Sequence, residues 1–148
     1  MKDKPAQGIV CSLVESYETE ARLLEEVIDY TERSEKLAEG GDFHALCHCL
    51  LGRGERIEAI AQLEAKRRNP EKELSGRIPE DVKEARDRAL IAHGKAIIAN
   101  NRLRAVLAEL KTVFEKEISA LEHKKTATHA YNEVSASSSH SIFLDRER

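Results

Sequence analysis

The residues whose types and spacing come nearest to a chemical site are His44, Cys47 and His48. Spacings of three and four place their side chains near one face of a helix, where imidazole and thiolate groups can bind a soft divalent ion. Only three ligands are local, and the chain supplies no clear fourth. Phe43 and Leu46 are expected to occupy the core-facing side of the same segment, so the histidines are expected to face water. We therefore expect no metal site.

No other motif for catalysis or cofactor binding appears in the sequence. It contains no glycine-rich phosphate loop, nucleophile elbow, HExxH motif or CxxC pair. Its carboxylates are spread over charged helix faces, so general acid–base chemistry has no visible place. The three cysteines, Cys11, Cys47 and Cys49, are an odd number without a disulfide spacing, which favours a reducing compartment. We expect a cytoplasmic protein that is not an enzyme and needs no cofactor.

Composition excludes several classes of protein and favours long helices. Of the 148 residues, 34% are charged, 4% are aromatic and three are proline. So few turn-forming and aromatic residues argue against a β-sandwich or barrel, whereas abundant Ala, Glu, Lys, Leu and Arg is typical of helices. No apolar run approaches the roughly 18 residues that a membrane span requires. Neither direct membrane insertion nor a signal peptide is expected.

The net charge of −3 is distributed unevenly along the chain. Residues 1–40 carry ten acids and five bases, residues 41–70 carry four and five, and residues 71–148 carry thirteen and fourteen. An acidic first segment beside nearly balanced ones fits neighbouring helices with complementary surfaces. The basic clusters at 66–68 and 124–125 complement the dipoles at expected helix C-termini. Neither has interleaved aromatics, so no nucleic acid is expected as a partner.

Apolar periodicity predicts a first helix over residues 9–39 and a second over residues 42–68. Gly40 and Gly41 end the first helix, and Asp42 is a suitable N-cap for the second. So short a connection predicts an antiparallel hairpin. The predicted apolar stripes are Val10, Val14, Tyr17, Ala21, Leu24 and Ile28, widened by Leu13, Val27 and Leu37, and then Phe43, Leu46, Leu50, Ile57, Ile60 and Leu63.

Two glycines, Gly52 and Gly54, lie inside the predicted second helix. Each weakens a helix by about 1 kcal/mol relative to Ala. Two interpretations stay open. The pair is a local weak point of the helix, or another helix approaches closely at Gly54, which lies near the apolar stripe.

A third helix is predicted over residues 79–125, after a linker that contains Pro and Gly. Pro79 suits its first position, and Glu80 and Asp81 follow in its positively polarised first turn. At 1.5 Å per residue such a helix is about 70 Å long. The predicted fold class is all-α: residues 1–125 form an elongated antiparallel three-helix bundle or coiled coil with a long third helix, followed by a flexible C-terminal tail.

The third helix carries its own apolar stripe. His93 and Asn100 fall on or beside it, and they are expected to be buried or edge polar groups that help to set the register of the helices. The stripe comprises Leu90, Ile97, Leu103, Leu107, Leu110, Phe114, Ile118 and Leu121.

The last segment, residues 126–148, differs from the rest of the chain. Residues 135–141 are almost entirely Ser, Ala and His, which predicts flexibility. Two interpretations of the flanking apolar groups stay open: they form a docking segment for a partner, or they fold onto the bundle. These flanking residues are Tyr131, Ile142, Phe143 and Leu144.

Three segments carry a resemblance to a known family. The hairpin reads LAEGGDFHAL at 37–46 and LLGRGERI at 50–57, the third helix contains NNRL at 100–103, and the tail runs from Tyr131 and Asn132 to FLDR at 143–146. In combination, order and spacing these segments resemble the FlgN/FliT-like flagellar type III export chaperones, with the FlgN-like branch favoured. The resemblance covers most of the chain.

The resemblance implies a cytosolic export chaperone for flagellar assembly. Such a protein binds the C-terminal helices of late flagellar substrates, either hook–filament junction proteins or the filament cap. It prevents their premature assembly and delivers them to the cytosolic domain of the export gate. The implied substrate-binding residues are Leu107, Leu110, Phe114, Ile118 and Leu121, of which Leu107 is expected to be core and Ile118 and Leu121 to be exposed. The implied residues for gate or tail docking are Tyr131, Ile142, Phe143 and Leu144.

Other functions share parts of the same pattern. The alternative is a structural coiled-coil adaptor with no export role, since it has the same helical periodicity. A third class is a metal-dependent helical enzyme that uses His44, Cys47 and His48. The residues leave open which flagellar substrate is held. Monomer and homodimer also both stay open, because an unfilled groove can be satisfied by self-association.

Overall fold

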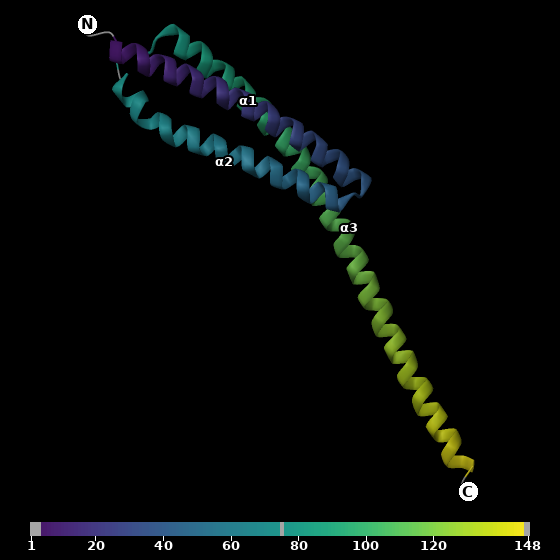
Figure 1. The fold of residues 1–148 in the computed structure, drawn as a ribbon. Coiled ribbons are helices and arrows are strands. Elements are labelled where there is room, and N and C mark those ends of the chain that lie inside the picture. The colour runs from purple at the N-terminus through teal and green to yellow at the C-terminus, as the bar shows by residue number, and fades with distance from the viewer. Residues whose placement is uncertain (1–3, 75, 147–148) are drawn as a thin grey trace. The chain divides into compact units, whose positions relative to one another are not determined.

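Three α-helices follow one another in a computed structural model of the chain (Figure 1). The structure describes the backbone of residues 4–74 and 76–146 and the side chains of residues 6–74 and 76–135. The helices are α1 (Lys4–Gly40), α2 (Phe43–Glu73) and α3 (Glu80–Arg146), and those ranges contain no strand. The predicted all-α three-helix fold is therefore confirmed. Within the same ranges, no helix combines the length and the apolar character needed to cross a membrane.

Two helices continue further than the sequence predicted. Helix α2 passes through Pro70 and ends at Glu73 rather than near residue 68. Helix α3 continues to Arg146 rather than ending near residue 125. The chain has no Gly or Pro after Gly94, so no residue of the kind that stops a helix interrupts this segment. The flexibility of the tail stays a prediction.

The chain divides into two units, residues 1–107 and residues 108–148. The sequence placed this division after residue 125 instead. The first unit holds α1, α2 and the part of α3 that ends at Leu107, and the second holds the remainder of α3. The contacts between helices described below lie in the first unit.

The connection between α1 and α2 has the predicted turn chemistry. Gly41 has a φ of 77°, a left-handed conformation that suits glycine at the end of a helix. The Asp42 side chain accepts a hydrogen bond of 3.1 Å from the backbone N–H of Ala45, and so caps α2. At the next connection, the carbonyl of Pro79 accepts the N–H of Lys83 at 3.1 Å. Pro79 therefore lies one position before the first residue of α3, Glu80, rather than at the first position as predicted.

The core of the first unit is built from positions that alternate three and four residues apart on every helix, as in a coiled coil. Large side chains come mainly from α1 and α2, and α3 contributes mostly small ones. The buried or partly buried core positions are Leu13, Tyr17, Glu20, Leu24, Val27, Thr31, Ser34 and Ala38 on α1, Leu46, Cys49, Arg53, Arg56, Ile60, Leu63 and Arg67 on α2, and Val82, Ala85, Ala89, Ala92, Ala96, Ala99 and Leu103 on α3.

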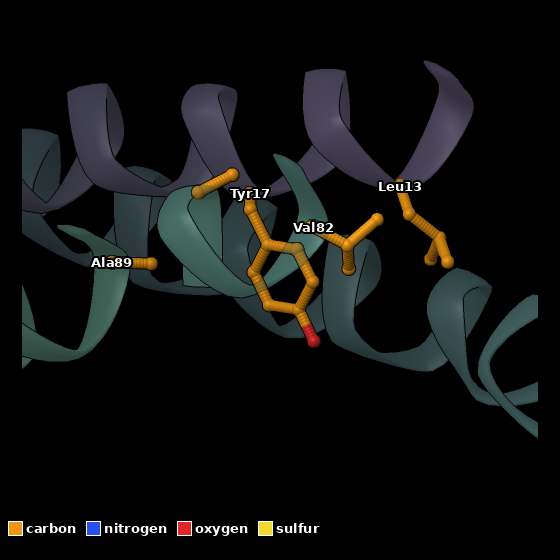
Figure 2. Packing of buried hydrophobic residues seen from close by; sticks show 5 residues of the cluster. Leu13, Tyr17, Val82 and Ala89 are labelled. Carbon is orange, nitrogen blue, oxygen red and sulfur yellow. The ribbon is translucent and has the colours of Figure 1, made fainter. Parts of the chain in front are cut away.

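Alanines rather than large aliphatic residues form most of the core-facing side of α3. Figure 2 shows Tyr17 of α1 against Val82 and Ala89 of α3 in one cluster of buried residues. The prediction that Leu90 and Ile97 face the core is wrong, because both are more than half exposed. Short side chains at the contact let two helices approach closely. A pattern read from the strongest hydrophobes therefore selected the wrong face at Leu90 and Ile97, whereas Leu103 of the same predicted stripe is buried.

The apolar stripe predicted for α2 also needs correction. Phe43 and Ile57 are 41% and 42% exposed, although the sequence placed both in the stripe. The close approach of another helix occurs at Gly52, where an added Cβ would lie 2.8 Å from Cε1 of Tyr30 on α1. Nothing lies within 4 Å of the equivalent position at Gly54, so of the two interpretations the close approach at Gly54 is wrong.

These two glycines give a matched pair of substitutions. Gly54→Ala is expected to raise the free energy of unfolding by up to about 1 kcal/mol, because Ala favours a helix and the space is open. Gly52→Ala is expected to be less stable than Gly54→Ala by at least about 1 kcal/mol, since the Tyr30 ring must move. Urea unfolding followed by circular dichroism measures both. Equal stabilities for the two variants would contradict the close approach at Gly52.

Candidate functional site

The residues predicted to bind a substrate protein lie along α3 with different degrees of burial. Leu107 and Leu110 are partly buried. Phe114, Ile118 and Leu121 are 40%, 55% and 64% exposed. Leu107 belongs to the first unit and the other four residues to the second.

Spacing on the helix places these side chains on one surface. Within the second unit, successive members from Leu110 to Leu121 are three or four residues apart, so they lie on one side of α3. A stripe of this kind matches the apolar side of a partner helix. We call it the α3 stripe, and it comprises Leu110, Phe114, Ile118 and Leu121.

The residues predicted for docking are only partly described. Tyr131 lies on α3 and is 72% exposed. Its ring is therefore accessible for a contact with a partner. The side chains of Ile142, Phe143 and Leu144 lie outside the described residues.

The cluster of His44, Cys47 and His48 faces outward, as the sequence predicted. All three are exposed, and the two imidazole rings pack edge to face with centroids 4.9 Å apart. Cys49 points the other way: it is buried, and its thiol donates a hydrogen bond of 3.4 Å to the carbonyl of Tyr30. The two neighbouring thiols thus lie on different sides of α2.

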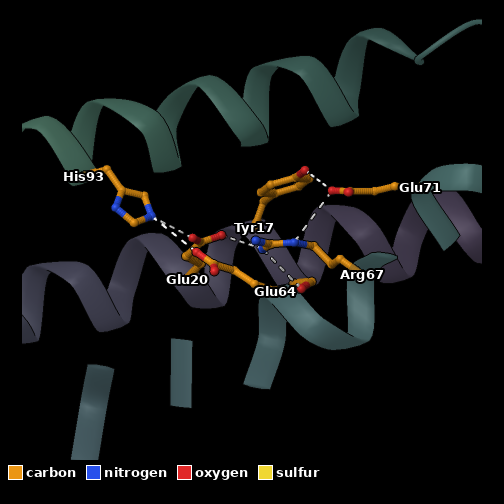
Figure 3. A network of polar contacts seen from close by, with 7 residues as sticks. Tyr17, Glu20, Glu64, Arg67, Glu71 and His93 are labelled. Carbon is orange, nitrogen blue, oxygen red and sulfur yellow. Dashed lines mark hydrogen bonds and ion pairs between the residues drawn. The ribbon is translucent and has the colours of Figure 1, made fainter. Parts of the chain in front are cut away.

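A buried polar network joins all three helices in the first unit (Figure 3). Glu20 on α1 is the most buried member, with its side chain 3% exposed. Its Oε1 lies 2.8 Å from Nε2 of His93 on α3, and its Oε2 lies 2.5 Å from Nη1 of Arg67 on α2. Glu64 of α2 lies 3.8 Å from the same imidazole nitrogen. One carboxylate is therefore held by a group from each of the other two helices.

Arg67 organises the other side of this network. Its guanidinium lies 4.1 Å from the centroid of the Tyr17 ring, and its Nη1 donates to Oγ of Ser16 at 3.4 Å. Its Nε lies 3.8 Å from Oε1 of Glu71, which also accepts a hydrogen bond from the Tyr17 hydroxyl. Because the Arg67 side chain is 8% exposed, these contacts replace water around the charge.

A second polar layer lies further along the bundle. Nε of Arg53 donates to Oγ1 of Thr31 at 2.9 Å, and its Nη2 donates to Oδ1 of Asn100 at 2.6 Å. These residues come from α2, α1 and α3. His93 and Asn100 are both partly buried and both bond to other helices, which agrees with their predicted place at the edge of the core.

The network offers one cluster of possible metal ligands among the described residues. Ligand atoms of Glu20, Glu64 and His93 all lie within 4.8 Å of one another. The guanidinium of Arg67 already supplies a positive charge 2.5 Å from Oε2 of Glu20, and it would repel a cation there. The arrangement fits a structural cross-link between helices better than a metal centre.

Sequence reasoning missed Glu20 and Arg67 as members of a site. Each looks like one of many surface charges on a helix. A signal was present, however, because Glu20 continues the three-and-four spacing of Leu13, Tyr17 and Leu24. A charged residue at a position of the repeat that otherwise holds buried apolar residues indicates a buried ion pair.

Comparisons with known proteins do not place the chain in a family. No family model, no curated protein and no solved structure matches it. Its function is therefore argued from the residues and their geometry.

The Tyr17 hydroxyl gives a pH dependence that can be tested. Burial, followed by the hydrogen bond to Glu71, raises the pKa of Tyr17 from 10.0 to about 12. The folded protein holds the phenolic proton more tightly than the unfolded chain, so this contribution to stability is complete below pH 10 and is lost as the pH rises toward 12. Its size is about 2 kcal/mol. The difference in unfolding free energy between the wild type and Tyr17→Phe should shrink by this amount over that range, and a constant difference would contradict it.

Removing one partner of the buried ion pair should lower the free energy of unfolding. Arg67→Met leaves the Glu20 carboxylate buried without its guanidinium, and we expect a loss of about 3–5 kcal/mol of unfolding free energy. The double variant Glu20→Leu with Arg67→Met should be more stable than Arg67→Met alone, because no unpaired charge remains. Denaturant unfolding of the wild type, Glu20→Leu, Arg67→Met and the double variant gives the coupling energy. Additive effects would show that the two groups do not interact.

Proposed function

We propose that this protein is an export chaperone that binds an amphipathic helix of a partner protein along the α3 stripe. The sequence resemblance names flagellar type III export as the process. It gives the C-terminal helices of hook–filament junction proteins or of the filament cap as the clients. The location implied by the resemblance is the cytoplasm.

The observation that carries this proposal is the exposure of the α3 stripe. Ile118 and Leu121 are 55% and 64% exposed, although large apolar side chains at helical spacing usually face a neighbour. A client helix that covers them removes apolar surface from water, which is the main driving force for association. It also shields the client surface that would otherwise assemble.

Tyr131 supports a separate contact with the export gate. It lies ten residues beyond Leu121 on α3 and is 72% exposed. An exposed tyrosine offers both an apolar ring and a hydroxyl to a partner. In the proposed division of function, the α3 stripe holds the client and Tyr131 contacts the cytosolic domain of the gate.

The alternative function is that of a structural coiled-coil adaptor, and the same stripe supports it. An adaptor also presents apolar side chains at helical spacing. It has no need to bind the C-terminal helices of flagellar proteins. Client binding therefore separates the two functions.

Calorimetric titration with C-terminal fragments of the hook-junction and filament-cap proteins tests the proposal. We expect stoichiometric binding to one fragment with a negative heat-capacity change from apolar burial. Leu121→Asp should weaken binding by about tenfold or more and leave the helical content intact, since the side chain is largely exposed.

Tyr131→Ala is the matched control, because it is equally exposed on the same helix and should leave client binding unchanged. If the protein is folded but binds none of the fragments, the adaptor function would be favoured. Unfolding of Leu121→Asp would show that this residue is core and that the binding surface lies elsewhere.

A further inference from the structure

A second apolar surface lies on α3 within the first unit, on the side turned away from the alanine core. Leu90, Ile91, Ile97 and Ile98 are between 57% and 61% exposed. Gly94 lies at their centre, and nothing comes within 4 Å of the position that a Cβ would take there. We call this surface, made of Leu90, Ile91, Gly94, Ile97 and Ile98, the outer face of α3.

The geometry of the helix gathers these side chains around the glycine. At about 100° per residue, Leu90 and Ile97 lie about 40–60° to one side of Gly94, and Ile91 and Ile98 lie equally far to the other side. The buried residues Ala85, Ala92 and Ala99 lie on the opposite side of the helix. The outer face is thus a hollow at Gly94 flanked by aliphatic side chains, which allows another helix to approach closely.

We propose that the outer face binds the same face of a second copy of this chain, with the two α3 helices antiparallel and crossing at Gly94. This inference does not rest on the proposed function, because it uses different residues from the α3 stripe.

The distribution of charge along α3 selects a second copy as the occupant. Residues 80–87 carry four acids and two bases, whereas residues 101–108 carry two bases and no acid. In an antiparallel pair centred on Gly94, the acidic segment of each copy lies opposite the basic segment of the other. A parallel pair would place like charges together, at a cost in affinity.

At individual positions the antiparallel arrangement gives a pair of opposite charges, Glu84 with Arg102, and a pair of like charges, Arg86 with Arg104, on the other side of Gly94. Glu84 and Arg102 lie about 80° around the helix on the same side of Gly94, ten and eight residues away from it. A two-fold axis at Gly94 therefore brings Glu84 of one copy beside Arg102 of the other. Asp87 of one copy lies opposite Asn101 of the other, whose amide can donate to it. Both contacts occur twice, as an isologous dimer requires.

The mass of the full chain in solution tests the proposal. Sedimentation equilibrium should give a mass that rises with concentration toward twice the 16.6 kDa of one chain, within a micromolar range. A single-chain mass up to roughly 100 μM would overturn the proposal and leave the outer face for another protein.

Substitutions then show which surface forms the dimer. Ile91→Glu with Ile98→Glu should raise the dissociation constant by about 100-fold or more and keep the helical content. Leu51→Glu is the matched control, because Leu51 is a 67% exposed apolar residue on α2, outside the outer face. Ile118→Glu should also leave the dimer intact. A dimer lost in Ile118→Glu but kept in the Ile91 and Ile98 variant would overturn the proposal.

Two further variants test the crossing point and the direction of the helices. Gly94→Leu enlarges the apolar surface but fills the hollow, so we expect it to dissociate the dimer. An unchanged or tighter dimer would overturn a crossing at Gly94. Glu84→Arg and Arg102→Glu should each weaken the dimer, and the two together should restore it. If the double variant dimerises no more tightly than the single variants, the antiparallel pairing would be overturned.

Discussion

A carboxylate buried between three helices is the constraint on which the rest of the structure depends. Glu20 is almost without exposed surface, so its carboxylate needs polar partners inside the protein. Arg67 of α2 and His93 of α3 contact it from two different helices. A shift of α2 by one turn, about 5.4 Å, would take Arg67 away from the carboxylate, and the same shift of α3 would take His93 away. The pairing therefore fixes the register of the bundle, and the second polar layer around Arg53 repeats the same requirement.

Once this register is set, the composition of α3 decides which of its sides is covered. Its alanines pack against α1 and α2, where short side chains permit a close contact. The larger residues of the same segment, such as Leu90 and Ile98, are left exposed. Contiguous exposed aliphatic groups are typical of surfaces that bind another protein. The alanine contact therefore explains why α3 presents its larger apolar residues on the outer side.

The two surfaces on α3 suit different partners. The α3 stripe follows one line of residues at helical spacing, which matches a single amphipathic helix. The outer face has a glycine at its centre and opposite charges at its two ends, which match its own two-fold copy. Because the two surfaces share no residue, client binding and self-association can be separated by substitution. The proposed chaperone function and the proposed dimer therefore stand independently.

The sequence by itself determined the number and order of the helices and the turn between the first two. Gly41 and Asp42 act through local backbone rules, so they were predicted correctly. The end of α3 was not, because serine weakens a helix without stopping it and alanine favours one. Only the tertiary structure decided which side of each helix is buried. Helix α3 carries both an alanine series and a leucine and isoleucine series at helical spacing. The choice between them depends on how closely two helices can pack around Glu20 and Arg67, which no local pattern records.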